Sequence, residues 1–155
     1  MTRHYGRGPR GERLVCKVPH GHWKTSTFVA ALRHNRATAP FLLDGPMNGT
    51  SFPVYARQIL APTLRRDDIV IMDNVVVHKV AGIREGIEAR GAILLYLPPY
   101  SPDLNAIEQF FSKLKAVLRK AAARSIERLW KVIGSCLTDF SQRECAAYLA
   151  NAGYG

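Results

Sequence analysis

Long apolar runs, paired cysteines and acidic residues are all scarce in this chain of 155 residues. No stretch stays apolar over the roughly 18 residues that a membrane-spanning helix needs. The first 20 residues carry four arginines and lack the apolar centre of a secretory signal. The three cysteines show no C-x-x-C spacing, which argues against a disulfide framework and for a reducing compartment. We therefore expect a cytoplasmic protein without a membrane anchor.

The shortage of acidic residues leaves the chain strongly basic. It has 22 Lys and Arg against 12 Asp and Glu, for a formal net charge of +10. Residues 1–36 hold eight basic and one acidic side chain, residues 37–112 hold six and eight, and residues 113–155 hold eight and three. Two basic flanks around an acidic centre suit a protein that grips a polyanion and holds cations at one place, although an uneven surface charge alone would look the same.

An apolar content of 47% is enough for one folded domain with a real core. Residues 1–13 are rich in glycine and arginine and predict a flexible basic arm. Residues 14–18, 24–32 and 39–44 predict three strands that we expect to be antiparallel, and residues 51–64 show a helical repeat. We expect a core over residues 14–124 and C-terminal helices over residues 125–155.

The clearest unit is a strand–helix–strand crossover. Residues 69–72 form a continuous apolar run, which is typical of a strand buried on both faces. A short amphipathic helix over residues 79–90 follows, and residues 92–97 predict a second buried strand parallel to the first. A long helix from about Asn105 to Arg124 comes next, and two shorter helices begin at Ser125 and Ser141. The order predicts a mixed α/β layer fold.

Two carboxylates follow the strands of this crossover. Asp73 closes the first strand, and the segment from residue 97 to Glu108 leaves the second. Because the carboxyl ends of parallel strands meet at one edge of the sheet, we expect the two side chains to converge. Carboxylates beside a phosphate are the ligands that Mg²⁺ prefers, so a site for phosphodiester chemistry is one interpretation. The alternative is structural, since Asp73 and Asn74 could form an Asx-turn and Glu108 could cap the helix from Asn105.

The long helix favours the metal interpretation. Its apolar stripe must face the core, and it consists of Ile107, Phe110, Phe111, Leu114, Leu118 and Ala121. Glu108, Ser112, Lys115 and Arg119 lie on the adjacent stripe. The carboxylate thus heads a row with two basic side chains, which suits a metal-bound phosphate whose strand runs along the helix. A solvated basic face would show the same spacing. His78, five residues after Asp73, could reach the same place, and a polar residue at the start of a helix would explain it equally well.

These segments together resemble a known family. The string IVIMDN at residues 69–74 followed by His78, the string LPPYSPDLNAIE at residues 97–108, and Lys113 and Lys115 resemble the catalytic domain of mariner-like DDE transposases, most closely the bacterial insertion-sequence branch. The resemblance covers nearly the whole chain, and the gap of 34 residues between Asp73 and Glu108 is part of it.

The resemblance implies a ribonuclease-H-like fold, a mixed sheet flanked by helices, whose members cut and rejoin DNA with two Mg²⁺ or Mn²⁺ ions held by three carboxylates. It makes Asp73 the second carboxylate of the triad and Glu108 the third. It also implies phosphate contacts, for which the candidates are Arg3, Arg7, Arg10, Arg13, Lys113, Lys115 and Arg119.

The chain departs from the family at two places. Ala106 stands where the family usually has proline, and the first family carboxylate lies on a strand before the basic arm, ahead of Met1. Glu12 lies in the wrong segment to replace this carboxylate. Asp44 ends a strand and could stand in for it, but in the family that position is not catalytic. The missing strand would be central, beside residues 69–73, and its absence would expose an apolar edge.

We therefore expect the back portion of a DNA transposase catalytic domain, nucleoid-associated in a bacterium. The intended activity is Mg²⁺-dependent cleavage and strand transfer of DNA phosphodiesters in insertion-sequence transposition, and the chain alone is expected to be inactive. The expected partners are transposon ends, target DNA, the product of an upstream reading frame and, when complete, further copies of the protein. The alternative is an inactive DNA-binding remnant that regulates transposition.

Overall fold

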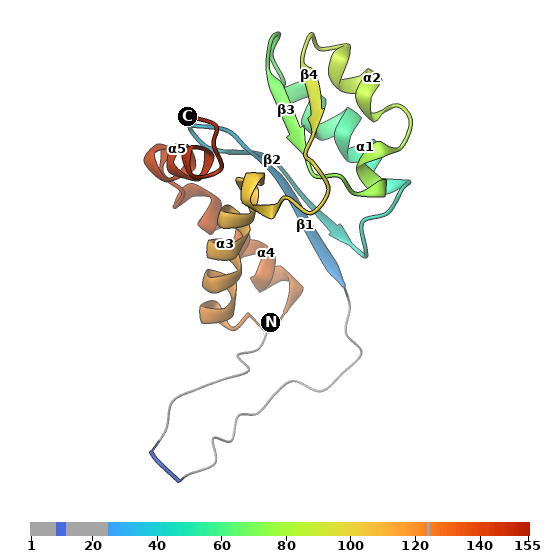
Figure 1. Cartoon of the computed structure of the whole chain (residues 1–155). Coiled ribbons are helices and arrows are strands. Elements are labelled where there is room, and N and C mark those ends of the chain that lie inside the picture. Colours follow the sequence, from blue (N-terminus) through green and yellow to red (C-terminus); the bar gives the residue numbers. More distant parts are fainter. Residues whose placement is uncertain (1–8, 12–24, 124) are drawn as a thin grey trace.

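The computed structural model describes residues 9–11, 25–123 and 125–155. The predicted strand at 14–18 and most of the predicted arm at 1–13 lie outside these residues. Figure 1 shows a paired set of long strands with a helical group on one side and a smaller α/β group on the other. None of the helices in the described ranges is long and apolar enough to cross a membrane.

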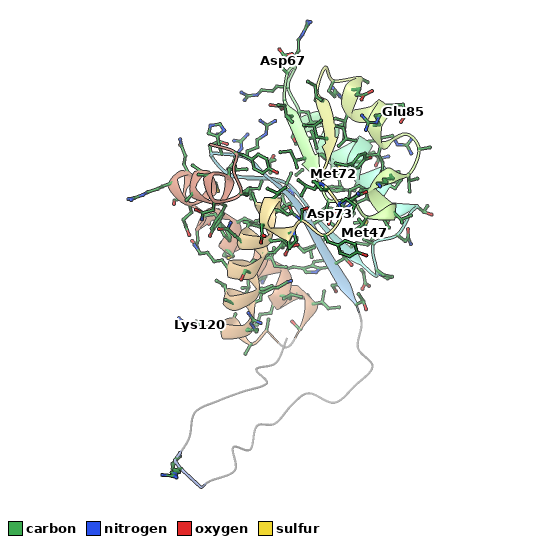
Figure 2. All side chains as sticks on the ribbon, in the orientation of Figure 1. Met47, Asp67, Met72, Asp73, Glu85 and Lys120 are labelled. Carbon is green, nitrogen blue, oxygen red and sulfur yellow. The ribbon has the colours of Figure 1, made fainter. Side chains whose placement is uncertain are left out.

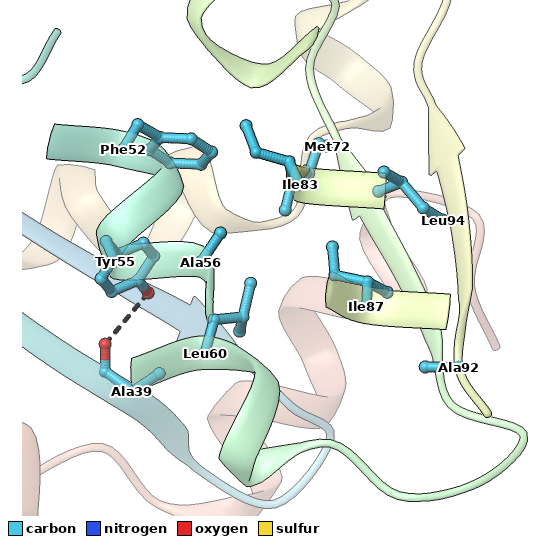
Figure 3. Packing of buried hydrophobic residues seen from close by; sticks show 10 residues of the cluster. All are labelled: Ala39, Phe52, Tyr55, Ala56, Leu60, Met72, Ile83, Ile87, Ala92 and Leu94. Atoms are coloured by element: carbon cyan, nitrogen blue, oxygen red, sulfur yellow. Dashed lines mark hydrogen bonds between the residues drawn. The ribbon is translucent and has the colours of Figure 1, made fainter. Parts of the chain in front are cut away.

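Strands β1 (Ser26–Leu32) and β2 (Ala37–Asp44) form an antiparallel hairpin. The turn between them is closed by a hydrogen bond from the Arg33 amide to the Arg36 carbonyl oxygen, 2.9 Å. The register shifts between Val29 and Ala31, so β2 carries a bulge there. Ala39, in the bulge, has a φ of 50°, and its carbonyl oxygen accepts a hydrogen bond from the Tyr55 hydroxyl at 3.0 Å (Figure 3).

The hairpin separates two apolar cores because alternate side chains of β1 point to opposite faces. Val29 and Ala31 pack on the first core, whereas Phe28, Ala30 and Leu32 pack on the second. The first core also holds α1 (Ser51–Tyr55), the π-helical turn η1 (Ala56–Leu60), α2 (Ile83–Glu88) and the small sheet (Figure 3). The second core holds α3 (Ile107–Ala121), α4 (Ile126–Thr138) and α5 (Gln142–Asn151).

The crossover has the predicted parallel topology. Strand β3 (Ile69–Met72) pairs in parallel with β4 (Ile93–Tyr96), and α2 connects them after the 3₁₀ turn η3 (Val76–Lys79). The expectation that residues 69–72 are buried on both faces is wrong. Ile69 is 58% exposed, as are Ile93 at 51% and Leu95 at 49%. Helices η1 and α2 cover one face of this two-stranded sheet, and the other face has only partial cover.

The helices differ from expectation mainly at their ends. The 3₁₀ turn η4 (Pro102–Leu104) delays α3, which begins at Ile107 rather than Asn105 and ends at Ala121 before Ala122, with a φ of 45°. Phe110, Leu114 and Leu118 of the predicted stripe are buried. Ser125 caps α4 by accepting the Arg128 amide, and Ser141 and Glu144 form the predicted capping box of α5.

The described residues contain two sheets, one with β1 and β2 and the other with β3 and β4. The sequence predicts a single mixed sheet. The structure has two sheets instead, and the break between them lies beside β3, where a strand is expected to be missing.

Phe110 is fully buried in the second core, with its ring centroid 4.4 Å from that of Phe140 and 5.4 Å from that of Phe111. We expect Phe110→Ala to lower the free energy of unfolding by about 3–5 kcal/mol, because it removes a buried ring and leaves a cavity. Urea unfolding measures this. Tyr100→Ala, at a fully exposed aromatic, is the control and should stay within about 0.5 kcal/mol of the parent. Equal losses in the two variants would contradict the assigned core.

Candidate functional site

The carboxyl ends of β3 and β4 form the edge at which the predicted residues meet. The Leu97 amide, just after β4, donates to the Met72 carbonyl oxygen at 2.8 Å, so the parallel ladder continues to the last residue of β3. The two chain segments therefore leave the sheet side by side. One begins with Asp73, and the other leads through η4 to Glu108.

Asp73 occupies a central position in the molecule (Figure 2). His78 Nδ1 lies 2.5 Å from Asp73 Oδ1 and 3.4 Å from the Asp73 carbonyl oxygen. The His78 ring is therefore in close contact with the Asp73 carboxylate, although the geometry is not that of a hydrogen bond. Asp73 Oδ1 and Asn74 Oδ1 are both buried and lack a hydrogen bond within the described part of the chain. An Asx-turn would use such an oxygen, so the structural alternative for Asp73 and Asn74 is not what the structure has.

His78 is held in place from two sides. Its ring centroid lies 4.3 Å from that of Phe52, and its carbonyl oxygen accepts the Tyr96 hydroxyl at 2.7 Å. Since Tyr96 ends β4, the contact links the segment after β3 to the second strand. His78 thus contacts Asp73, the carboxylate that the sequence places within its reach.

Glu108 lies in the first turn of α3. Its amide donates to the Asn105 carbonyl oxygen at 3.0 Å, but the helix has no side-chain cap, so capping does not explain this carboxylate either. The preceding turn is fixed by the Tyr154 hydroxyl, which donates to the Leu104 carbonyl oxygen at 2.7 Å.

Asp73, Asn105 and Glu108 line one cavity of about 590 Å³. The Asp68 carboxylate also lines this cavity. It is bound to Arg33, where β1 ends and β3 begins. Asp44 ends β2 and is not part of the lining. Within the described residues, no three His, Cys, Asp or Glu side chains gather closely enough to form a complete metal site. Asp73 and Glu108, the two carboxylates that the sequence singles out, thus line the same cavity.

The basic candidates differ in their surroundings. Lys115 and Arg119 are exposed on α3. Lys113 instead donates to Glu144 of α5 at 2.5 Å and lies over the Phe140 ring at 4.7 Å from its centroid. Arg10 is exposed in a short turn, and Arg3, Arg7 and Arg13 lie outside the described residues. Lys113 therefore belongs to the packing of α3 on α5, a role that helix periodicity could not reveal.

A protein-family model described as DDE superfamily endonuclease matches residues 1–130. The chain belongs to the DDE superfamily endonucleases. No curated protein matches it.

Solved structures show which fold this DDE chain has. It resembles the Mos1 strand transfer complex, with a TM-score of 0.74 and 16% identity, over 97% of this chain and 46% of that one. It also resembles the Mos1 transposase paired-end complex with left transposon end, with a TM-score of 0.75 and 16% identity, over 97% of this chain and 47% of that one. The likeness to the catalytic domain of Mos1 mariner transposase has a TM-score of 0.68 and 14% identity, over 83% of this chain and 74% of that one. These likenesses confirm the expected ribonuclease-H-like fold, and the family model confirms the expected DDE superfamily. The chain spans less than half the length of the proteins in the two complexes.

The pair between Lys113 and Glu144 makes stability depend on pH. Their hydrogen bond lowers the pKa of Glu144 and raises the pKa of Lys113. A lowered carboxyl pKa stabilises the fold at neutral pH, and this contribution is lost as pH falls through the folded-state value. The contribution of Lys113 is present at neutral pH and is lost as pH rises through its raised pKa, above about 10.4.

We expect the free energy of unfolding to fall between about pH 6 and pH 3 more steeply in the parent than in Glu144→Gln, because glutamine keeps the capping box but loses the charge. Urea unfolding across this pH range measures the difference. Identical pH profiles would show that the pair does not stabilise the fold.

Proposed function

We propose that the chain is a DNA transposase catalytic domain whose chemistry is Mg²⁺- or Mn²⁺-dependent cleavage and strand transfer of DNA phosphodiesters. The observation that carries the proposal is that Asp73 and Glu108 line one cavity while Asp73 Oδ1 and Asn74 Oδ1 are buried without hydrogen bonds. Two similar structures are the Mos1 strand transfer complex and the Mos1 paired-end complex with left transposon end, which supports DNA as the partner.

The residues present fit a divalent cation. A buried oxygen without a hydrogen bond costs free energy, about 1–3 kcal/mol, and a hard cation removes that cost. Asp73 and Glu108 offer carboxylate oxygens to the cavity, and Asn74, next to Asp73, offers an amide oxygen; oxygen is the donor type that Mg²⁺ and Mn²⁺ take. When bound, such ions activate a water or hydroxyl and stabilise the leaving oxygen.

The protein side chains supply orientation and charge. His78 sits against Asp73 and is fixed by Phe52 and Tyr96, so the carboxylate has a defined direction. Exposed Lys115 and Arg119 continue the stripe of Glu108 along α3, which places positive charge where a DNA backbone leaving the cavity would pass. Lys113 is not included in this surface because Glu144 already balances its charge.

Asp73 and Glu108 correspond to the second and third carboxylates of the triad. The first has no counterpart in the described lining of the cavity, where Asp68 is already bound to Arg33. We therefore propose that this chain by itself binds DNA without cleaving it, since two carboxylates hold a pair of ions poorly. The alternative function, a DNA-binding regulator of transposition, needs the same surface and no metal. Strand transfer by the purified chain that is lost in Asp73→Ala would contradict the proposed inactivity and point to a stand-in such as Asp44 or Glu12.

Metal binding tests the role of Asp73. We expect Asp73→Asn to weaken Mn²⁺ binding, measured by electron paramagnetic resonance of the free ion, at least about tenfold, because a charged ligand becomes neutral. Asp103→Asn is the matched control, since Asp103 is an exposed carboxylate in η4 outside the cavity lining. Equal Mn²⁺ affinity in both variants and the parent would remove Asp73 from the site.

DNA binding tests the surface on α3. With about six phosphate contacts, the slope of log K against log salt should be near −5. Lys115→Ala and Arg119→Ala should each reduce this slope by about one and weaken binding to all sequences similarly. Fluorescence anisotropy at several salt concentrations measures it. Arg84→Ala is the control, because Arg84 is paired with Glu88 on α2 at 2.9 Å. A slope unchanged in both α3 variants would place the DNA elsewhere.

A further inference from the structure

The turn that leads into α3 is held by a residue that lies far away in the sequence. The hydroxyl of Tyr154, which follows α5, donates to the Leu104 carbonyl oxygen at 2.7 Å. Tyr154, Leu104 and Glu108 all line the cavity of about 590 Å³ that also contains Asp73. The contact therefore ends at the turn immediately before the helix whose first turn carries Glu108.

The turn has only local hydrogen bonds of its own. The Leu104 amide donates to the Ser101 carbonyl oxygen at 3.3 Å, and the Asn105 amide donates to the Pro102 carbonyl oxygen at 2.9 Å. Asn105, between η4 and α3, has a φ of −100° and a ψ of 86°, which belong to neither a helix nor a strand. Within the described residues no side chain caps α3. The start of α3 thus depends on contacts from other elements for a fixed position.

A helix C-cap places Tyr154 against this turn. The Tyr154 amide donates to the Leu149 carbonyl oxygen at 2.9 Å, and the Gly153 amide donates to the Ala150 carbonyl oxygen at 3.0 Å. Gly153 has a φ of 87°, the left-handed conformation that favours glycine. These two bonds around a left-handed glycine form a Schellman motif, which ends a helix and reverses the chain. The motif fixes the backbone from which the Tyr154 side chain reaches the turn.

Asn151, the last residue of α5, makes a second contact with the same region. Its side-chain nitrogen donates to Gln109 Oε1 at 3.0 Å. Gln109 directly follows Glu108, whereas the contact of Tyr154 lies in the turn before it. The end of α5 therefore holds the chain on both sides of Glu108. The helix is itself anchored in the second core by Cys145, which is fully buried.

We propose that Tyr154 and Asn151 are positioning residues, through which the end of α5 keeps the Glu108 carboxylate in the cavity with Asp73. This role rests on the metal site proposed above. An ion is bound well only by molecules in which both carboxylates are in place, so the apparent affinity falls with the fraction of molecules that are correctly arranged. Neither positioning side chain has to contact the metal or DNA.

The main test is Tyr154→Phe in the full chain, because it removes only the hydroxyl. We expect it to weaken Mn²⁺ binding, measured by electron paramagnetic resonance of the free ion, at least about threefold, since one hydrogen bond is lost. Tyr148→Phe is the matched control. Tyr148 lies on the same helix, its hydroxyl meets Glu144 at 3.5 Å, and it is not part of the cavity lining. This control should leave Mn²⁺ affinity within about twofold of the parent.

Hydrogen exchange without metal, followed by nuclear magnetic resonance, tests the positioning directly. In Tyr154→Phe the amides of Asn105 and Glu108 should exchange at least about threefold faster, because their hydrogen bonds open when the turn moves. The amide of Leu118, further along α3, should be unchanged. Tyr148→Phe should leave all three amides as they are in the parent.

A double-variant cycle separates positioning from a general loosening of the fold. Glu108→Gln should itself weaken Mn²⁺ binding, and Tyr154→Phe should cause no further loss in that background, because no charged ligand is left to position. Asn151→Ala and Gly153→Ala should act in the same direction as Tyr154→Phe in the parent. A Cβ at Gly153 has no atom within 4 Å among the described residues, so this variant disturbs only the left-handed backbone that places Tyr154.

Two results would overturn the positioning role and leave the proposed function standing. One is unchanged Mn²⁺ affinity in Tyr154→Phe beside a loss in Glu108→Gln. The other is an equal loss from Tyr154→Phe in the parent and in the Glu108→Gln background, which would mean that Tyr154 acts elsewhere. Unchanged Mn²⁺ affinity in Glu108→Gln alone would instead remove Glu108 from the metal site, and both the proposed metal chemistry and the positioning role would then be wrong.

Discussion

The parallel pairing of β3 with β4 is the constraint on which the candidate site depends. Parallel neighbours release their following segments at the same edge, so Asp73 and the turn that leads to Glu108 must emerge together although 34 residues separate them. The hydrogen bond from Leu97 to Met72 extends that pairing to the edge itself. His78, placed by Phe52 and Tyr96, then fills the side of Asp73 that faces the first core. Asp73 Oδ1 and Asn74 Oδ1 remain buried without hydrogen bonds among the described residues.

The second organising feature is the space between the sheets. The β1–β2 hairpin separates two well-packed cores, yet its outer edge and that of β3 face each other without pairing. Arg33 closes one end of this space through Asp68, and the candidate site lies at the other. Ile69, which the apolar run at residues 69–72 predicts to be buried, is exposed beside this space.

The family and the fold of the chain bear on which chemistry it can perform. Membership of the DDE superfamily and the ribonuclease-H-like fold describe a scaffold, and a scaffold does not by itself establish chemistry. On this scaffold two carboxylates share a cavity, and the described residues do not complete a metal site. DNA binding draws on a different set of groups, the exposed cations of α3, so binding and cleavage can be separated by experiment.

Much of this protein could be derived from local pattern. Apolar periodicity predicted β1 to β4 and the buried stripe of α3, and Ser141 with Glu144 predicted a capping box, because each depends on residues a few positions apart. Parallel-strand logic alone was enough to bring Asp73 and Glu108 to one edge. Tertiary structure decided the rest. Whether a strand is buried on one face or on both depends on which elements cover the sheet, so the predicted burial of β3 on both faces was wrong. Whether Lys113 meets DNA or Glu144 depends on the position of α5, 31 residues later. The facing edges of β1 and β3 arise only when two distant segments pack together, and no spacing in the sequence encodes that distance.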